Sequence, residues 1–155
     1  MNKQELYRPL VENLRKAFGD RLKAVVLFGS QARSEEILER DHDILVVIEG
    51  LPRNPLYRLK EVRQTILDIP LQINFIAKTP EEVAANLTPL MLEVCLDGLC
   101  LYGEAYFRPF RERALKALKQ SGLKRVQVGQ EWYWRFEKAP ARDWELTWDG
   151  YRELP

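Results

Sequence analysis

Apolar residues in this chain recur at two spacings, one typical of helices and the other of strands. Between residues 2 and 18 they recur every three or four positions, which predicts a helix that packs on a sheet. Further along, runs rich in valine, isoleucine and leucine predict buried strands. These strands are expected at residues 22–28, 42–49, 71–77 and 99–102. The pattern predicts an α/β protein with a mixed, twisted sheet of about four strands flanked by helices.

Helical signals separate the later strands. A helix with Leu59, Val62 and Ile66 on one face is expected after the glycine- and proline-containing loop at residues 50–55. The sequence Thr79-Pro80-Glu81-Glu82 is a capping box with proline at the first helical position, so a helix begins there. A further helix is expected to end at Gly98.

The composition changes after Gly103. We therefore predict two units, a domain at residues 1–103 and a C-terminal extension at 104–155. From Ala105 to Val128 seven basic residues and one acid accompany an apolar stripe, which predicts an amphipathic basic helix. All four tryptophans follow, at positions 132, 134, 144 and 148. Three interpretations stay open for these aromatic residues: packing on the chain's own sheet, an interface with a second copy, or stacking on a ligand.

The stretch between the first two predicted strands carries the candidate chemistry. Gly29-Ser30 closes the first strand, ten residues follow, and Asp41-His42-Asp43 opens the second strand. Glycine permits a sharp turn and close approach of a ligand, and Ser30 is a candidate helix N-cap beside amides that suit a phosphate. The two aspartates share one strand face, roughly 7 Å apart along the chain, and carboxylate oxygens suit magnesium. Strand alternation points His42 away from them, which favours a structural or surface-facing position over a catalytic one.

A phosphate site facing two carboxylates is suited to metal-assisted phosphoryl or nucleotidyl transfer. The sequences Phe28-Gly29-Ser30-Gln31-Ala32-Arg33 and Asp41-His42-Asp43-Ile44 resemble the motif of the minimal nucleotidyltransferases, which belong to the DNA polymerase β-like superfamily. The resemblance covers about residues 20–103. It implies a nucleotidyltransferase fold, Mg²⁺ as cofactor, with two ions, and ATP or another NTP as substrate.

The resemblance also assigns roles to single residues. It implies that Asp41 and Asp43 are catalytic and bind the metal, and that Gly29 and Ser30 bind the nucleotide. Arg33 could contact a phosphate, as arginine commonly does, or be an ordinary surface charge.

This chain departs from the family pattern at two positions. Ser34 stands where the family often has a glycine, and Asn74 stands where the family has a third carboxylate. Asparagine offers a metal one neutral carbonyl oxygen, so Asn74 would be a weak ligand. Asp68, six residues upstream, is the alternative third carboxylate.

Two functions follow from these residues. The first is transfer of a nucleoside monophosphate, AMP from ATP, to a hydroxyl acceptor. Family members of this size often act as antitoxins that modify a HEPN-type toxin, so the resemblance implies a separate protein partner. The alternative is a catalytically weak or inactive module of the same fold that binds nucleotide and partner.

The composition limits which partners, cellular location and cysteine chemistry are expected. With 24 Lys and Arg against 23 Asp and Glu there is no global basic field, so nucleic acid is not expected as a partner. Long apolar stretches and a signal-peptide pattern are absent, which indicates a cytoplasmic protein without membrane contact. Cys95 and Cys100 lie in apolar surroundings and are expected to be reduced thiols. The Trp-rich extension is expected to support a homodimer.

Overall fold

A four-stranded mixed sheet is the centre of the structure. The computed structural model describes residues 2–33, 41–129 and 131–155. Strand order is β3-β2-β1-β4, where β1 pairs antiparallel with β2 and β4, and β2 pairs parallel with β3. The strands span Leu22–Phe28 (β1), His42–Ile48 (β2), Ile73–Lys78 (β3) and Leu99–Tyr102 (β4). The predicted α/β class and sheet are confirmed.

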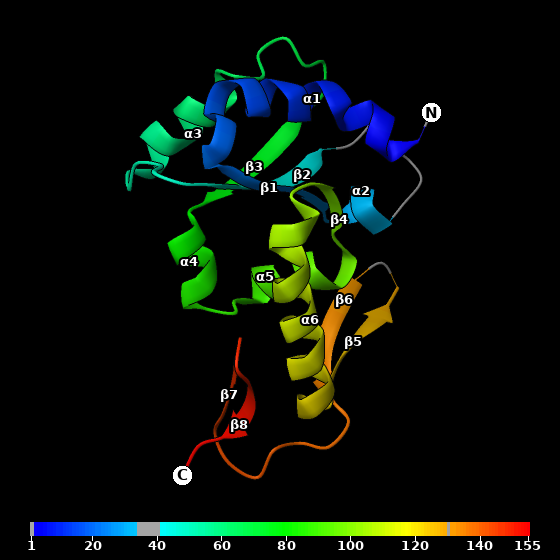
Figure 1. Ribbon diagram of the computed structural model, residues 1–155. Coiled ribbons are helices and arrows are strands. Elements are labelled where there is room, and N and C mark those ends of the chain that lie inside the picture. Colours follow the sequence, from blue (N-terminus) through cyan, green and yellow to red (C-terminus); the bar gives the residue numbers. More distant parts are fainter. Residues whose placement is uncertain (1, 34–40, 130) are drawn as a thin grey trace.

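Helices cover both faces of this sheet (Figure 1). One face packs against α1 and α3, and the other faces α4, α5 and α6. The helices span Lys3–Phe18 (α1), Ser30–Arg33 (α2), Pro55–Arg63 (α3), Pro80–Ala85 (α4), Pro89–Asp97 (α5) and Glu104–Ser121 (α6), with a short 3₁₀ helix at Gly19–Arg21 (η1). No helix in these ranges is long and apolar enough to cross a membrane.

Strand β1 is apolar on both faces because each face contributes to a separate core. Val25 and Leu27 belong to the core under α1, whereas Ala24, Val26 and Phe28 belong to the core shared with α5 and α6. All five side chains are buried. The continuous apolar run that predicted burial on both faces therefore has a direct structural cause.

The predicted basic helix is shorter than the sequence pattern indicated. It ends at Ser121, and the following Gly122 adopts a left-handed conformation with φ +70°. Its amide donates to the carbonyl of Leu118, which closes the last turn. Residues 123–128, which we predicted to be helical, instead form strand β5, which pairs antiparallel with β6 from Leu123 opposite Phe136 to Val128 opposite Glu131.

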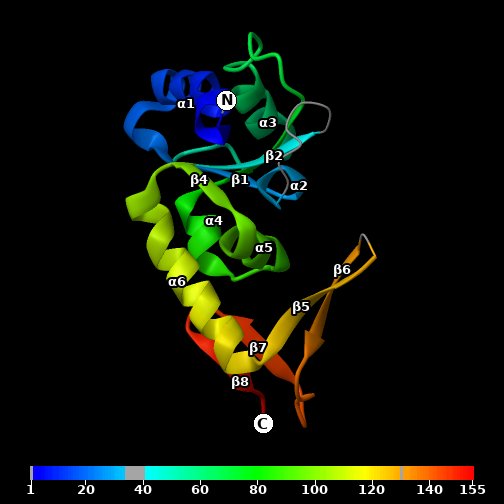
Figure 2. The ribbon, with the colours of Figure 1, turned by 90° about the vertical axis from the view of Figure 1, so that its right-hand side faces the viewer.

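The C-terminal region contains two antiparallel hairpins that the sequence analysis did not predict. They are formed by β5 (Leu123–Val128) with β6 (Glu131–Phe136) and by β7 (Trp144–Thr147) with β8 (Gly150–Glu153). Figure 2 shows the first hairpin turning from the end of α6 back toward α2.

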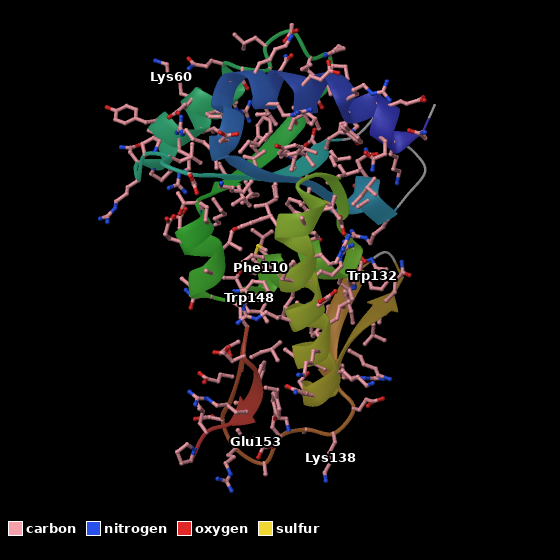
Figure 3. All side chains as sticks on the ribbon, in the orientation of Figure 1. Lys60, Phe110, Trp132, Lys138, Trp148 and Glu153 are labelled. Carbon is pink, nitrogen blue, oxygen red and sulfur yellow. The ribbon has the colours of Figure 1, made fainter. Side chains whose placement is uncertain are left out.

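The tryptophans differ in their environments. Trp148 is buried in the core, packs against Phe110 with ring centroids 5.0 Å apart, and donates its indole N–H to the carbonyl of Val83 (Figure 3). The other three are 37–40% exposed. Packing on the chain's own core is therefore confirmed for Trp148 alone. The boundary between residues 103 and 104 stays a prediction, since α6 and Trp148 share the core of one sheet face.

His42 is buried on the α1 side of the sheet, away from the site described below. Its Nδ1 lies 2.5 Å from the hydroxyl of Tyr7, and the two rings meet edge to face. Burial lowers the pKa of His42, although the charges of Asp41 and Asp43 oppose that shift. Burial also raises the pKa of Tyr7 to about 12. The predicted orientation of His42, away from the two aspartates, is thus confirmed, and of the two expected positions the buried, structural one is observed.

The buried His42 makes stability depend on pH. Since its pKa is lower in the folded chain than in the unfolded chain, the unfolded chain binds more protons below about pH 6.5, the ordinary histidine pKa. The free energy of unfolding should therefore decrease as pH falls from 7 toward the folded pKa. Urea unfolding at several pH values measures this slope. Because His42 is the chain's one histidine, His42→Gln should flatten the slope, and an unchanged slope would contradict this assignment.

Candidate active site

The ends of three strands bring the predicted site residues together. Asp43 on β2 pairs with Phe28 of β1 on one side and with Asn74 of β3 on the other. Gly29 directly follows Phe28, so it lies beside Asp43. Asp41 is the residue just before β2. The strand register therefore places Asp41, Asp43, Asn74 and Gly29 at one edge of the sheet.

Asn74 lies between the two aspartates. Its Nδ2 is 3.3 Å from Oδ2 of Asp41 and 3.4 Å from Oδ1 of Asp43, and the amide donates to both carboxylates. Strand alternation explains the arrangement, because Ile73 and Phe75 are buried on the opposite face and direct Asn74 outward. The side chains of Asp41, Asp43 and Asn74 are therefore close enough together to bind the same ligand.

Gly29 is required by the close approach of Asp43. Its φ is +72°, and a Cβ atom built on it would lie 2.3 Å from Oδ2 of Asp43. A side chain at position 29 would fit only if the Asp43 carboxylate moved. The glycine of the motif thus makes room for the Asp43 carboxylate, in addition to allowing the turn into α2.

Helix α2 begins immediately at this turn. The amides of Ala32 and Arg33 donate to the carbonyl of Gly29, at 3.2 and 3.3 Å. Ser30 is the first helical residue, so the predicted N-cap position belongs to Gly29 instead. Ser34 lies outside the described residues, as do the charged residues Glu35, Glu36, Glu39 and Arg40.

Arg33 is held by two acids of α5 that sequence reasoning missed. Its Nη1 lies 3.2 Å from both the carboxylate of Glu93 and that of Asp97. Asp97 also accepts two hydrogen bonds from Arg125 of β5, at 2.6 and 2.7 Å. No motif connects these residues, which lie far apart in sequence, so only the fold reveals the cluster.

Trp132 of β6 completes the contact between the hairpin and the site. Its ring centroid lies 4.6 Å from the guanidinium carbon of Arg125 and 6.0 Å from that of Arg33, both within cation–π range. Figure 3 shows Trp132 at the upper end of the hairpin, to the right of α6. The C-terminal hairpin therefore contacts the helix that follows Gly29.

The acids of this region titrate differently. Burial raises the pKa of Asp43, Glu93 and Asp41 raise it further, and the Asn74 amide and Arg33 act in the opposite direction. For Asp97, burial also acts to raise the pKa, but the hydrogen bonds and charge of Arg125 and Arg33 hold it below the ordinary value. Asp43 is thus a carboxylate whose negative charge would be stabilised by a nearby cation.

These side chains are chemically suited to a hard cation, although only two of the three are carboxylates. Among the described residues, no group of three His, Cys, Asp or Glu side chains is placed to hold a metal. Two carboxylates and an amide carbonyl are nevertheless oxygen donors that Mg²⁺ accepts, with its remaining positions left to water or phosphate. Rotating the Asn74 amide by half a turn would place its oxygen where the nitrogen lies. The alternative carboxylate, Asp68, instead accepts from Asn13 of α1 at 2.8 Å.

A strand edge with two carboxylates beside a glycine turn is the arrangement expected of a nucleotidyltransferase. No family model matches the chain. In sequence it is 26% identical over 131 residues to a curated protein of Methanocaldococcus jannaschii whose name proposes a protein adenylyltransferase, a match that covers 81% of this chain and 88% of that protein.

Solved structures give the same fold. A chain of a toxin–antitoxin complex with AMP-PNP superposes with a TM-score of 0.55 at 16% identity, covering 76% of this chain and 88% of that one. A chain from the complex of tri-AMPylated Shewanella oneidensis HEPN toxin with MNT antitoxin superposes with a TM-score of 0.53 at 17% identity. This match covers 76% of the present chain and 87% of that one. These findings confirm the nucleotidyltransferase fold and the resemblance to the minimal nucleotidyltransferases.

Replacing Gly29 tests the contact with Asp43. Gly29→Ala should lower the free energy of unfolding by about 1–2 kcal/mol for the left-handed backbone alone, and further because the Cβ must displace the Asp43 carboxylate. Gly129→Ala is the matched control, since its φ is +64° and, chain neighbours aside, no atom of the described residues lies within 4 Å of its added Cβ. Chemical denaturation compares them, and equal losses would contradict a specific contact at Gly29.

Proposed function

We propose that this chain is a magnesium-dependent nucleotidyltransferase that moves AMP from ATP to a hydroxyl of an acceptor. The observation that carries the proposal is the convergence of Asp41, Asp43 and Asn74 beside Gly29. A site of two carboxylates next to the glycine turn that opens α2 is suited to holding a metal–triphosphate complex. The adenylyltransferase name of the sequence relative supports AMP as the transferred group.

Each residue then has a role that its position supports. Asp41 and Asp43 would hold Mg²⁺, with the Asn74 carbonyl as a weaker ligand, and the ion would supply positive charge to the triphosphate and to the attacking oxygen. Gly29 and Ser30 would bind phosphate oxygens through their amides. The acceptor oxygen forms a bond to the α-phosphorus as the bond to pyrophosphate breaks.

Arg33 is proposed as a phosphate ligand that α5 holds in position. Only its Nη1 is used by Glu93 and Asp97, so Nε and Nη2 have no hydrogen-bond partner among the described residues. A planar guanidinium can therefore keep both acids and still donate to a phosphate. Fixing the side chain beforehand lowers the entropic cost of binding.

The proposed acceptor is a protein, and the context an antitoxin that modifies a HEPN-type toxin. Two structures with the same fold come from toxin–antitoxin complexes, one with AMP-PNP and the other with a tri-AMPylated HEPN toxin. The partner would be a separate chain, and cytoplasmic location is part of the same proposal.

A second function is supported by Asn74. Its amide nitrogen, rather than an acidic oxygen, faces both aspartates. A site with two carboxylates binds a divalent ion less strongly than a site with three. The chain could therefore bind nucleotide and partner with little or no turnover, and the following experiment separates the two functions.

Asp41→Asn and Asp43→Asn should each reduce AMP transfer by at least a hundredfold, because each removes a charged metal ligand. The measurement is transfer of label from α-³²P-ATP to protein in the presence of Mg²⁺ or EDTA. Asp20→Asn, an exposed acid on η1, is the control and should behave as wild type. Asn74→Asp should increase transfer or metal affinity.

Two outcomes oppose the proposal in different ways. Nucleotide binding without any transfer, with activity appearing only in Asn74→Asp, would favour the binding module. Transfer that persists in both aspartate variants would contradict the assigned site.

Arg33→Gln should raise the Kd for Mg–AMP-PNP about tenfold, which corresponds to about 1.4 kcal/mol for one charged phosphate contact. Calorimetric titration measures it, with Arg53→Gln in the exposed loop before α3 as the matched control. If Arg33→Gln binds as tightly as wild type, Arg33 serves only to hold Glu93 and Asp97.

A further inference from the structure

The outer edge of β6 is available for pairing. β5 and β6 form a sheet of two strands, so β6 has one strand neighbour among the described residues. The amide of Glu137 donates to the carbonyl of Gly122 at 3.0 Å, so Glu137 directs its backbone toward the β5 side. In an antiparallel ladder, successive residues direct their N–H and C=O groups to alternate sides. The backbone groups of every second residue before Glu137 therefore also face β5, namely those of Arg135, Tyr133 and Glu131. Trp132 and Trp134 therefore direct their N–H and C=O groups outward.

Strand β6 carries exposed aromatic side chains. Trp132, Tyr133 and Trp134 are 40%, 50% and 37% exposed, and Val128 on β5 is 65% exposed. An unpaired strand edge is a template for another strand, and exposed aromatic side chains are typical anchors of interfaces. In the described part of the chain, no other element donates to or accepts from the outward backbone groups of β6.

We propose that a second copy of this chain pairs with β6, antiparallel and around a two-fold axis at Tyr133. The pairing would join the two hairpins into a four-stranded sheet with the order β5-β6-β6-β5. Trp132 of one copy would lie opposite Trp134 of the other, and both residues direct their backbone groups outward, as the ladder requires. Tyr133 would lie opposite the partner's Tyr133 at a non-hydrogen-bonded position.

The charges of β6 favour this register over those with the axis nearer the end of the strand. With the axis at Tyr133, Glu131 lies opposite the partner's Arg135, and the symmetry produces the ion pair twice. Moving the axis to Trp134 places Glu131 opposite the partner's Glu137, and moving it to Arg135 places two arginines opposite each other. Like charges at directly opposed positions oppose pairing. Strand β5 has no acidic residue, so pairing of its edge with itself offers no such ion pair.

The single chain leaves these charges poorly matched. Arg135 lies directly across from Lys124 on β5, a like-charged neighbour. Lys124 forms its ion pair with Glu137, and Arg135 has no ion pair among the described residues. Glu131 accepts a hydrogen bond from Tyr133 of the same strand. Pairing with a second copy would supply Arg135 with a carboxylate without breaking the contacts of Trp132 with Arg33 and Arg125, which use the side chain.

Sedimentation equilibrium with charge reversals tests the register. Wild type should have twice the 18.2 kDa mass of one chain at tens of micromolar. Glu131→Arg and Arg135→Glu should each weaken the dimer at least tenfold in Kd, and the double variant should restore it because every pair is recreated with exchanged signs. Lys138→Glu, an exposed reversal beyond β6, should leave the dimer unchanged.

A cysteine at the axis tests the geometry separately. Directly opposed, non-hydrogen-bonded residues have Cα atoms about 4.5 Å apart, which lies in the range of a disulfide. Tyr133→Cys should therefore form a covalent dimer on mild oxidation, whereas Lys138→Cys should not. Burial raises the pKa of Cys95 and Cys100 to about 12, so the native thiols react slowly.

Either of two results would overturn the proposal. Wild type could remain a monomer throughout the concentration range. Alternatively, single and double charge variants could dimerise equally, which would place the interface elsewhere.

Discussion

The site depends on the position of Asp43 between two strands. Because β2 pairs with β1 and β3 at once, Asp43 is fixed opposite Phe28 on one side and Asn74 on the other. A shift of one residue in either pairing would direct the carboxylate into the core. Both faces of β1 and β2 are apolar and pack into two separate cores, so such a shift would exchange side chains between the cores and disrupt the packing of both. The hydrophobic pattern thus determines the geometry of the polar site.

The same constraint explains Gly29. The carboxylate of Asp43 occupies the space that a Cβ atom would need, so the turn into α2 requires glycine for two reasons, the backbone conformation and the contact. The glycine of the motif therefore serves the backbone turn and also makes room for the carboxylate of Asp43. Gly29 and Asp43, fourteen positions apart in sequence, form one structural unit.

The sequence predicted those parts of the structure that follow from local patterns. Strands β1 and β4 were predicted at their observed bounds, since uniform apolar runs between clear turn signals leave little choice. The predicted end of α6 was wrong because basic residues continue past Gly122. The apolar positions 123, 126 and 128, which favour a strand, were a weaker signal than this charge. Glu93, Asp97 and Arg125 could not be predicted, because their contact arises from packing among α2, α5 and β5.

Asp97 connects the two predicted units of the chain. It accepts from Arg33 beside the site and from Arg125 on the hairpin, and Trp132 packs on both guanidiniums. The C-terminal region thereby contacts the proposed nucleotide site as well as the core under α6. Under the proposed function, the hairpin would support both the phosphate-binding arginine and the pairing of two copies.

Anomalous diffraction from crystals grown with Mn²⁺ and AMP-PNP would test the central claim most directly. The account predicts a manganese peak between the carboxylates of Asp41 and Asp43, with the triphosphate beside Gly29 and Ser30. Manganese or nucleotide bound away from this strand edge, with both aspartates uncoordinated, would contradict it.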